Sequence, residues 1–248
     1  MLLSEIFEQL STGELNLMAL GNSGDGSIDD ANYDRLLNHI NLGLAALHTR
    51  FPIRTGELTL QLIAGKTLYP ISRKYAATNT VSEEVNKYIL DTEDALFLDD
   101  LMKVEKVYTS DNVLLPLNDA ADEYSILTPS MSTIKVPLSI VNKEADTPEE
   151  YLTDTLLVSY RAAHPKLPKG AGMYRASTVE IDLPYQFLEA LLYFVASRVN
   201  NPMGMTNEFH AGNSYSAKYE MACAALERDN IRVDQVSQPN RIQRNGWV

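Results

Sequence analysis

The chain of 248 residues is 45% hydrophobic and 22% charged, a composition typical of a globular protein and unlike that of disordered or collagen-like chains. Its 33 acidic and 21 basic side chains give a net charge of −12, which argues against tight DNA binding, because such binding depends on Lys and Arg neutralising phosphates. The single cysteine, Cys223, excludes an internal disulfide and a thiolate metal site, so we expect an intracellular protein.

Two helices are predicted at the start of the chain, separated by a glycine-rich loop at residues 21–26. The first is a short helix near residues 3–18. The second runs from Ser27 to Phe51, where apolar residues recur at steps of three and four and so form one helical face. Proline cannot continue a helix, so Pro52 ends it. The apolar face consists of Tyr33, Leu36, Leu37, Ile40, Leu44, Leu47 and Phe51.

Strands are predicted after Pro52, because apolar and polar residues now alternate with a period of two. We expect residues 58–62 to form a hairpin with residues 67–71 across the short turn Ala64-Gly65-Lys66. The middle of the chain is therefore mostly β. Further elements expected there are a hairpin at 102–109 and 113–117 and strands at 133–139 and 155–162.

Helical spacing returns at residues 187–199, after Asp182 and Pro184, which are residue types common at helix starts. This helix is apolar nearly all round, which predicts that several of its sides are covered, either at the centre of a bundle or at a subunit interface. A last helix is predicted near residues 209–229. The bundle or ring contacts expected on the 187–199 helix are Phe187, Leu191, Phe194, Val195 and Val199.

These elements predict an α+β fold. Helices from both chain ends have apolar faces that only the other pair can cover, so we expect one helical bundle with an antiparallel β domain inserted in it. The expected parts are N-terminal helices of the bundle at 1–54, the β-rich domain at 55–165, C-terminal helices of the bundle at 166–234 and an extended docking tail at 235–248.

Patterns for metal binding are weak. Asp25 to Asp29 imitates the start of a calcium loop, but Asp30 stands where glycine is expected and Leu36 where the closing glutamate is expected. The four histidines lack ligand spacing, and Cys223 lies on a buried helical stripe, where a thiol behaves as a small hydrophobe. We therefore predict no metal and no cofactor.

The stretch from Glu83 to Asp100 contains seven acidic residues and one lysine, Lys87. A pair of such carboxylates is the machinery of glycoside hydrolysis, so a cell-wall hydrolase is one alternative for the function. Acid-rich loops are more often solvated surface, and we favour a protein that is not an enzyme. The seven residues are Glu83, Glu84, Asp91, Glu93, Asp94, Asp99 and Asp100.

The C-terminal segment is the most informative part of the sequence. Trp247 is the only tryptophan, and residues 231–248 contain three Arg against one Asp, so a cationic tail follows an acidic body. Tryptophan and arginine are enriched at binding hot spots, which favours a docking arm over a frayed terminus.

The chain resembles the head-to-tail adaptor, or connector, proteins of short-tailed bacteriophages. The resemblance rests on the order of elements and on residues 36–44 with Arg50-Phe51-Pro52, and 191–199 continuing through Glu208-Phe209-His210 and Tyr219-Glu220 to the end of the chain. It covers the helical parts and extends to the β insertion only by position. It implies a dodecameric ring in the neck of a virion, assembled in the host cytoplasm, that joins the portal to the tail tube or nozzle.

The same resemblance implies that the C-terminal arm grips the portal protein and that DNA passes through the ring without specific binding. A tail fibre protein is a further candidate partner, through the β insertion. We expect no membrane contact, and a monomeric protein-binding module is a third alternative. The residues to which the portal-docking role is carried over are Arg241, Ile242, Arg244, Trp247 and Val248.

Overall fold

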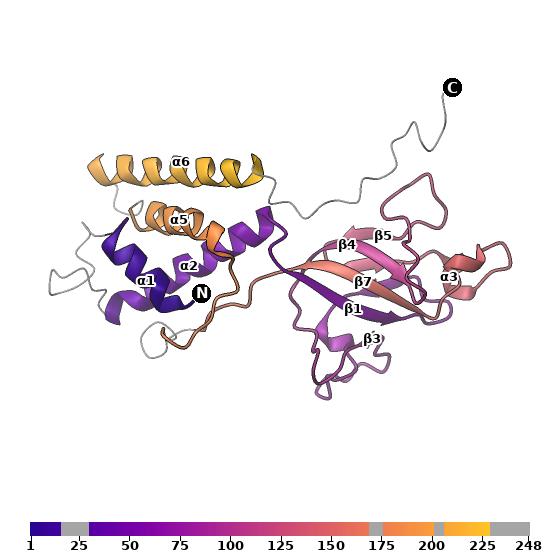
Figure 1. Cartoon of the computed structure of the whole chain (residues 1–248). Helices are drawn as coiled ribbons and strands as arrows, with labels where there is room; N and C mark the ends of the chain where they lie inside the picture. The colour runs from indigo at the N-terminus through magenta and orange to yellow at the C-terminus, as the bar shows by residue number, and fades with distance from the viewer. Residues whose placement is uncertain (16–29, 169–175, 201–205, 229–248) are drawn as a thin grey trace, which may run out of the picture. The chain divides into compact units, whose positions relative to one another are not determined.

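A computed structural model describes residues 1–15, 30–168, 176–200 and 206–228 of the chain. Its fold is mixed α+β with antiparallel sheets, which agrees with the predicted class. The chain divides into two compact units: a helical unit, residues 1–53 with 166–248, and a β unit, residues 54–165 (Figure 1).

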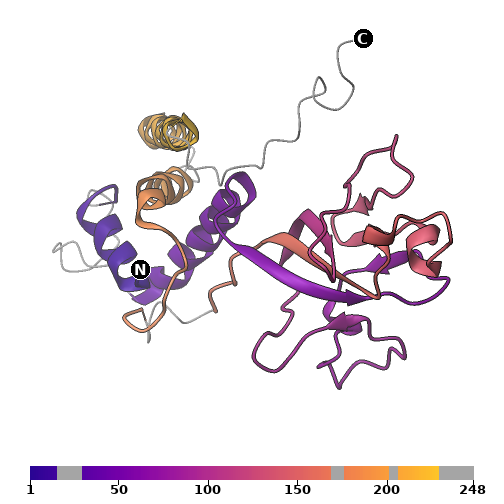
Figure 2. The same ribbon diagram turned by 45° about the vertical axis from the view of Figure 1, so that its right-hand side comes forward.

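The helical unit contains four α-helices in its described residues. They are α1 (Leu3–Thr12), α2 (Asp30–Arg50), α5 (Leu188–Asn200), which follows the short 3-10 turn η3 (Tyr185–Phe187), and α6 (Thr206–Arg228). Helix α5 contacts α1, α2 and α6, and it lies between α6 on one side and the two N-terminal helices on the other (Figure 1 and Figure 2). The helix predicted over 27–51 is thus confirmed over its described part, whereas α1 ends at Thr12, before the expected residue 18.

The core of this unit forms where α2 approaches α5 closely. Leu36, Ile40, Leu44 and Leu47 of the predicted α2 face are all buried. The approach depends on Gly43, since a Cβ built there would lie 2.6 Å from Leu191 Cδ1.

Backbone hydrogen bonds join the N-terminus to residues 179–181, which precede α5. The amide of Leu3 donates to the carbonyl of Val179 at 3.0 Å, and the amide of Ile181 donates to the carbonyl of Met1 at 2.8 Å. The N-terminal ammonium of Met1 returns a bond to the carbonyl of Ile181 at 3.1 Å. These bonds fix α1 against the segment that leads into α5.

The β unit consists of two antiparallel sheets. The four-stranded sheet has the order β3-β1-β7-β4, and the three-stranded sheet has the order β2-β6-β5. The alternation read from the sequence holds best in β7, where Leu156, Val158, Tyr160 and Ala162 are buried. The bounds of the elements are β1 (Thr55–Gln61), β2 (Leu68–Pro70), η1 (Arg73–Tyr75), β3 (Ile89–Leu90), β4 (Leu101–Thr109), β5 (Leu127–Ser130), β6 (Thr133–Lys135), α3 (Leu138–Asn142), η2 (Glu149–Tyr151) and β7 (Thr155–Ala162).

The hairpin expected between residues 58–62 and 67–71 is wrong. Strand β1 pairs with β7 and β3, whereas β2 pairs with β6 in the other sheet. A short loop permits a hairpin but does not require one, and the long β7 offers β1 seven paired positions where the three residues of β2 offer few.

The strand expected over 133–139 is shorter than predicted, because β6 ends at Lys135 and Leu138–Asn142 forms the helix α3. Pro137 is the N-cap residue of that helix, a position at which the missing backbone N–H of proline costs no helical hydrogen bond. The hairpin expected at 102–117 is confirmed around its turn, since the amide of Thr109 donates to the carbonyl of Val113 and that of Leu115 to Val107, both at 2.9 Å. Its second arm forms only an isolated bridge, Tyr108 with Leu114.

Candidate protein-docking surface

The residues predicted as bundle or ring contacts lie inside the helical unit. Phe187, Leu191, Val195 and Val199 are buried, and the half-buried Phe194 packs edge-on against Tyr219 of α6 at a ring-centroid distance of 5.3 Å. Four of the five side chains are thus covered within their own chain. The predicted portal-docking residues, Arg241, Ile242, Arg244, Trp247 and Val248, lie outside the described residues.

A loop of the β unit leaves its most exposed apolar side chains uncovered. This tip loop, residues 77–87, lies between the buried Ala76 and Tyr88. A bridge between Ala76 and Ile89 closes it at its base, and the amide of Ala77 donates to the carbonyl of Ile89 at 2.9 Å. The loop therefore begins and ends on the edge of the four-stranded sheet.

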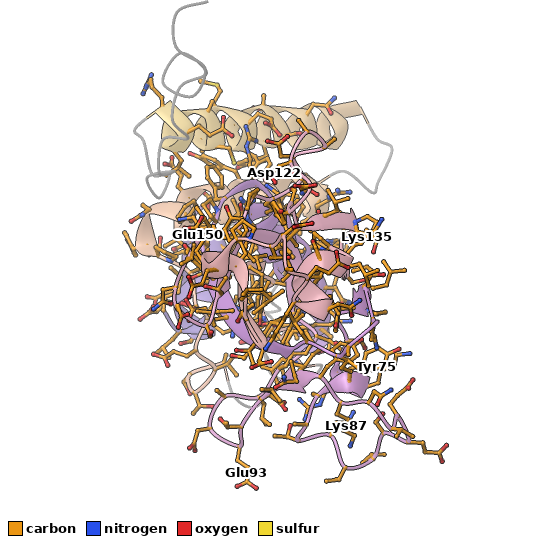
Figure 3. The ribbon with its side chains drawn as sticks, turned by 90° about the vertical axis from the view of Figure 1, so that its right-hand side faces the viewer. Tyr75, Lys87, Glu93, Asp122, Lys135 and Glu150 are labelled. Atoms are coloured by element: carbon orange, nitrogen blue, oxygen red, sulfur yellow. The ribbon has the colours of Figure 1, made fainter. Side chains whose placement is uncertain are left out.

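Aromatic rings form a firm base under the tip loop. Tyr88 stacks on Tyr75 at 4.7 Å between centroids and meets Tyr69 edge-on at 5.2 Å. Its hydroxyl donates to the carbonyl of Pro70 at 2.7 Å, and the Lys66 ammonium lies 4.1 Å from its ring centroid. Burial raises the pKa of Tyr88 far above its ordinary value, so the phenol remains protonated. Figure 3 labels Tyr75 at this base and Lys87 at the end of the loop.

Hydrogen bonds to residues outside the tip loop fix its conformation. The Ser82 hydroxyl donates to the carbonyl of Lys74 at 2.7 Å, and the Asn79 amide group donates to the carbonyl of Arg73 at 3.0 Å. Thr78 donates twice to Asp91, from its backbone N at 2.9 Å and from Oγ1 at 2.6 Å. These bonds hold the first half of the loop, residues 78–82, and an ion pair between Lys74 Nζ and Glu84 Oε1 at 3.4 Å reaches its second half.

Two valines project from this framework. Val81 is 90% exposed and Val85 is 93% exposed, the highest values among the large apolar side chains that the structure describes. Glu83 and Glu84 stand between them and are exposed as well. A held loop that presents apolar groups flanked by carboxylates has the composition of a protein-binding surface.

Three carboxylates of the stretch from Glu83 to Asp100 accept hydrogen bonds from other segments: Asp91 and Asp100, which are half-buried, and Asp99, which is exposed. Asp99 accepts a hydrogen bond from the amide of Arg73 at 2.5 Å. Asp100 accepts one from the Tyr160 hydroxyl at 2.9 Å and lies 3.5 Å from Arg54 Nη1. Glu93 and Asp94 are exposed. The hydrogen bonds of Asp99 and Asp100 thus tie the end of this stretch to Arg73 and to strand β7.

The charge of the β unit is strongly negative. Residues 54–165 contain 18 acidic and 10 basic side chains, a net charge of −8 out of the −12 of the whole chain. The acidic groups on the tip loop thus belong to a unit whose overall field repels anions and attracts cations.

The remaining sites considered from the sequence have structural surroundings. Cys223 is buried beside Tyr219, and burial raises the pKa of its thiol. His48 is buried in the helical core. Within the described ranges, no three His, Cys, Asp or Glu side chains are grouped to hold a metal ion, and no helix is long and apolar enough to cross a membrane. The calcium-like segment from Asp25 to Asp29 lies outside those ranges.

Residues 83–100 were predicted as an acidic, solvated loop, and Val81 and Val85 were not among the predicted site residues. The two valines stand four residues apart among polar neighbours, a spacing that also suits one face of a helix, so no period marks them as exposed loop residues. The comparisons add no identification: the chain matches no protein-family model, and no curated protein is significantly similar to it in sequence.

Proposed function

We propose that the chain is a structural adaptor, not an enzyme, that forms a dodecameric ring between the portal of a bacteriophage capsid and the tail tube or nozzle. In this proposal the helical unit forms the ring as a bundle with the β unit inserted in it, and the segment 235–248 is an extended arm that grips the portal. The protein belongs to the neck of the virion and lets DNA pass.

The observation that carries the proposal is that the N-terminal residues and the segment before α5 belong to one helical unit. Hydrogen bonds between Leu3 and Val179 and between Met1 and Ile181 close one helical unit around α5, and the whole β unit leaves and re-enters it between residues 53 and 166. This is the order of elements that the adaptor resemblance requires. It separates a helical body from a unit that is free to carry its own contacts.

The charge supports a channel role. Twelve copies of a chain with a net charge of −12 provide a wall that does not retain DNA, because retention requires cations that neutralise phosphates. The tail arm differs in charge from the acidic body, since residues 231–248 carry three Arg against one Asp. The positive charge of the arm makes it complementary to an acidic groove on another protein.

Mixing the purified chain with the portal protein of the same phage tests the proposal. The adaptor predicts that the chain binds the portal, and that deletion of residues 235–248 abolishes binding while far-ultraviolet circular dichroism stays the same. A matched variant, Arg241→Ala with Arg244→Ala and Trp247→Ala, keeps the length of the arm and should also lose binding. Undiminished binding by both variants would contradict the role of the arm.

A further inference from the structure

The tip loop presents apolar surface that the described chain does not cover. Side chains as exposed as Val81 and Val85 gain free energy when a partner buries them. Isolated exposed valines are ordinary on protein surfaces, so exposure alone does not define a binding site. Val81 and Val85 differ from such isolated valines in how their loop is held and in the charges beside them.

The tip loop is held in place before it meets a partner. Its contacts to Arg73, Lys74 and Asp91 come from residues outside the loop, and the stacked pair of Tyr75 and Tyr88 supports its base. A loop that is already ordered loses less conformational entropy on binding, which raises affinity for a given contact area. Val81 and Val85 therefore meet the requirements of an anchor in a partner's pocket.

The neighbouring charges identify the chemistry of the partner. Glu83 and Glu84 stand between the valines, where Glu83 is exposed and Glu84 lies 3.4 Å from Lys74 Nζ, and the unit that carries them has a net charge of −8. The β unit of a second copy has the same excess of carboxylates, so docking on it is opposed by repulsion. A surface with Lys or Arg around an apolar pocket is complementary to the tip loop.

We propose that the tip loop inserts Val81 and Val85 into an apolar pocket of another virion protein, and that Lys or Arg side chains at the rim of this pocket face Glu83 and Glu84. The inference rests on the proposed function, because it assigns the β unit a partner of its own beside the portal. The contact is made by a tail component and not by a neighbouring copy of this chain.

Photo-cross-linking in assembled particles tests this contact directly. A benzophenone amino acid is placed at position 81 or 85 of the full-length chain, and a matched control carries it at Met131, which is 81% exposed in the same β unit. The expected result is a cross-link from 81 and 85 to one peptide of a different protein, near Lys or Arg residues, and none from 131. Cross-links to another copy of the chain, or yields no higher than the control, would overturn the inference.

The same particles separate the two proposals. A chain that is absent from purified particles refutes the adaptor function, and the tip-loop contact fails with it. A chain that is present next to the portal, but whose positions 81 and 85 cross-link only to itself or to nothing, refutes the tip-loop contact alone.

The affinity of the chain for the cross-linked partner measures how much each side chain of the tip loop contributes to binding. The variant Val81→Ser with Val85→Ser should lower its affinity about 100-fold, since burial of each valine contributes about tenfold. The variant Glu83→Gln with Glu84→Gln should lower it only a few-fold and remove most of its salt dependence. All four side chains are exposed, and the ion pair of Glu84 with Lys74 is exposed as well, so thermal unfolding should change little. A serine variant that binds as tightly as the wild type would refute the proposed anchor.

Discussion

The Asp91 carboxylate receives two hydrogen bonds from Thr78, at 2.9 Å from the backbone N and at 2.6 Å from Oγ1, and a third from the amide of Phe97 at 3.3 Å. Thr78 stands at the start of the tip loop and Phe97 beyond its end. One side chain therefore ties the start of the tip loop, which exposes Val81 and Val85, to the segment that follows strand β3.

Replacement of Asp91 should loosen this segment. In Asp91→Ala the donors of Thr78 and Phe97 lose their acceptor, which should lower the free energy of unfolding by about 2 kcal/mol. Urea unfolding of the full chain measures the change, and amide hydrogen exchange at 77–87 should accelerate. The matched control, Asp94→Ala, alters an exposed side chain and should stay within about 0.5 kcal/mol of the wild type. Equal stability of the two variants would contradict the structural role of Asp91.

The same carboxylate should make stability depend on pH. Burial acts to raise the pKa of Asp91, but the hydrogen bonds from Thr78 and Phe97 outweigh it and the pKa is lowered. A lowered pKa in the folded state gives stability that is fully present above the unfolded value of about 4 and is lost as pH falls through the folded value. The stability difference between the wild type and Asp91→Asn should therefore shrink on acidification below about pH 4. A stability difference that grows in acid would show that folding raises the pKa of Asp91 and does not lower it.

Gly43 should resist replacement even by alanine. A Cβ at this position would lie 2.6 Å from Leu191 Cδ1 and 3.0 Å from Phe194 Cδ1, and Leu191 is fully buried. Alanine gains up to about 1 kcal/mol of helix propensity, but overpacking costs about 1–3 kcal/mol. We expect Gly43→Ala to lose about 1 kcal/mol in urea unfolding, whereas Asn38→Ala on the exposed side of α2 should be neutral. A stabilised Gly43→Ala would mean that α2 and α5 are not tightly packed there.

Arg50 links the end of α2 to α6. Its Nη1 lies 2.7 Å from Glu220 Oε2 and its Nε lies 2.7 Å from Glu227 Oε1, and these hydrogen bonds raise the pKa of the guanidinium. Because Glu220 is well exposed, Arg50→Met should cost only about 1 kcal/mol, and less at high salt. Amide exchange over residues 213–228 should rise, while Arg35→Met on the same helix leaves it unchanged. Unaltered exchange in Arg50→Met would show that the pairs do not hold α6.

The sequence predicts regular elements well where one period extends over many residues. The α2 face and the alternation in β7 are of this kind, and both agree with the structure. Prediction from the sequence fails where the pairing of a strand depends on a distant partner. The patterns of β1 and β2 are compatible with a hairpin, but β1 pairs with β7 and β2 pairs with β6. The end of the strand predicted over 133–139 fails for another reason, because Pro137 stands at the N-cap of a helix that begins at Leu138.

The candidate surface was less predictable than the fold. The exposure of Val81 and Val85 depends on contacts such as Thr78 with Asp91, which join residues 13 apart through side chains and leave no period in the sequence. The acidic stretch was visible, but composition does not separate Asp91, Asp99 and Asp100, which accept hydrogen bonds from other segments, from Glu93 and Asp94, which are simply exposed. The helix at 187–199 was easier to predict, because four of the five apolar positions named from its sequence are buried in the structure.

Electron microscopy of the full-length chain mixed with purified portal tests the central claim most directly. The adaptor account predicts an additional ring of twelve copies beneath the portal, with residues 235–248 lying in grooves of the portal subunits and the β units outside the channel. Portal rings that remain bare at saturating chain concentration, or a bound chain whose final residues fold back on their own molecule, would contradict it.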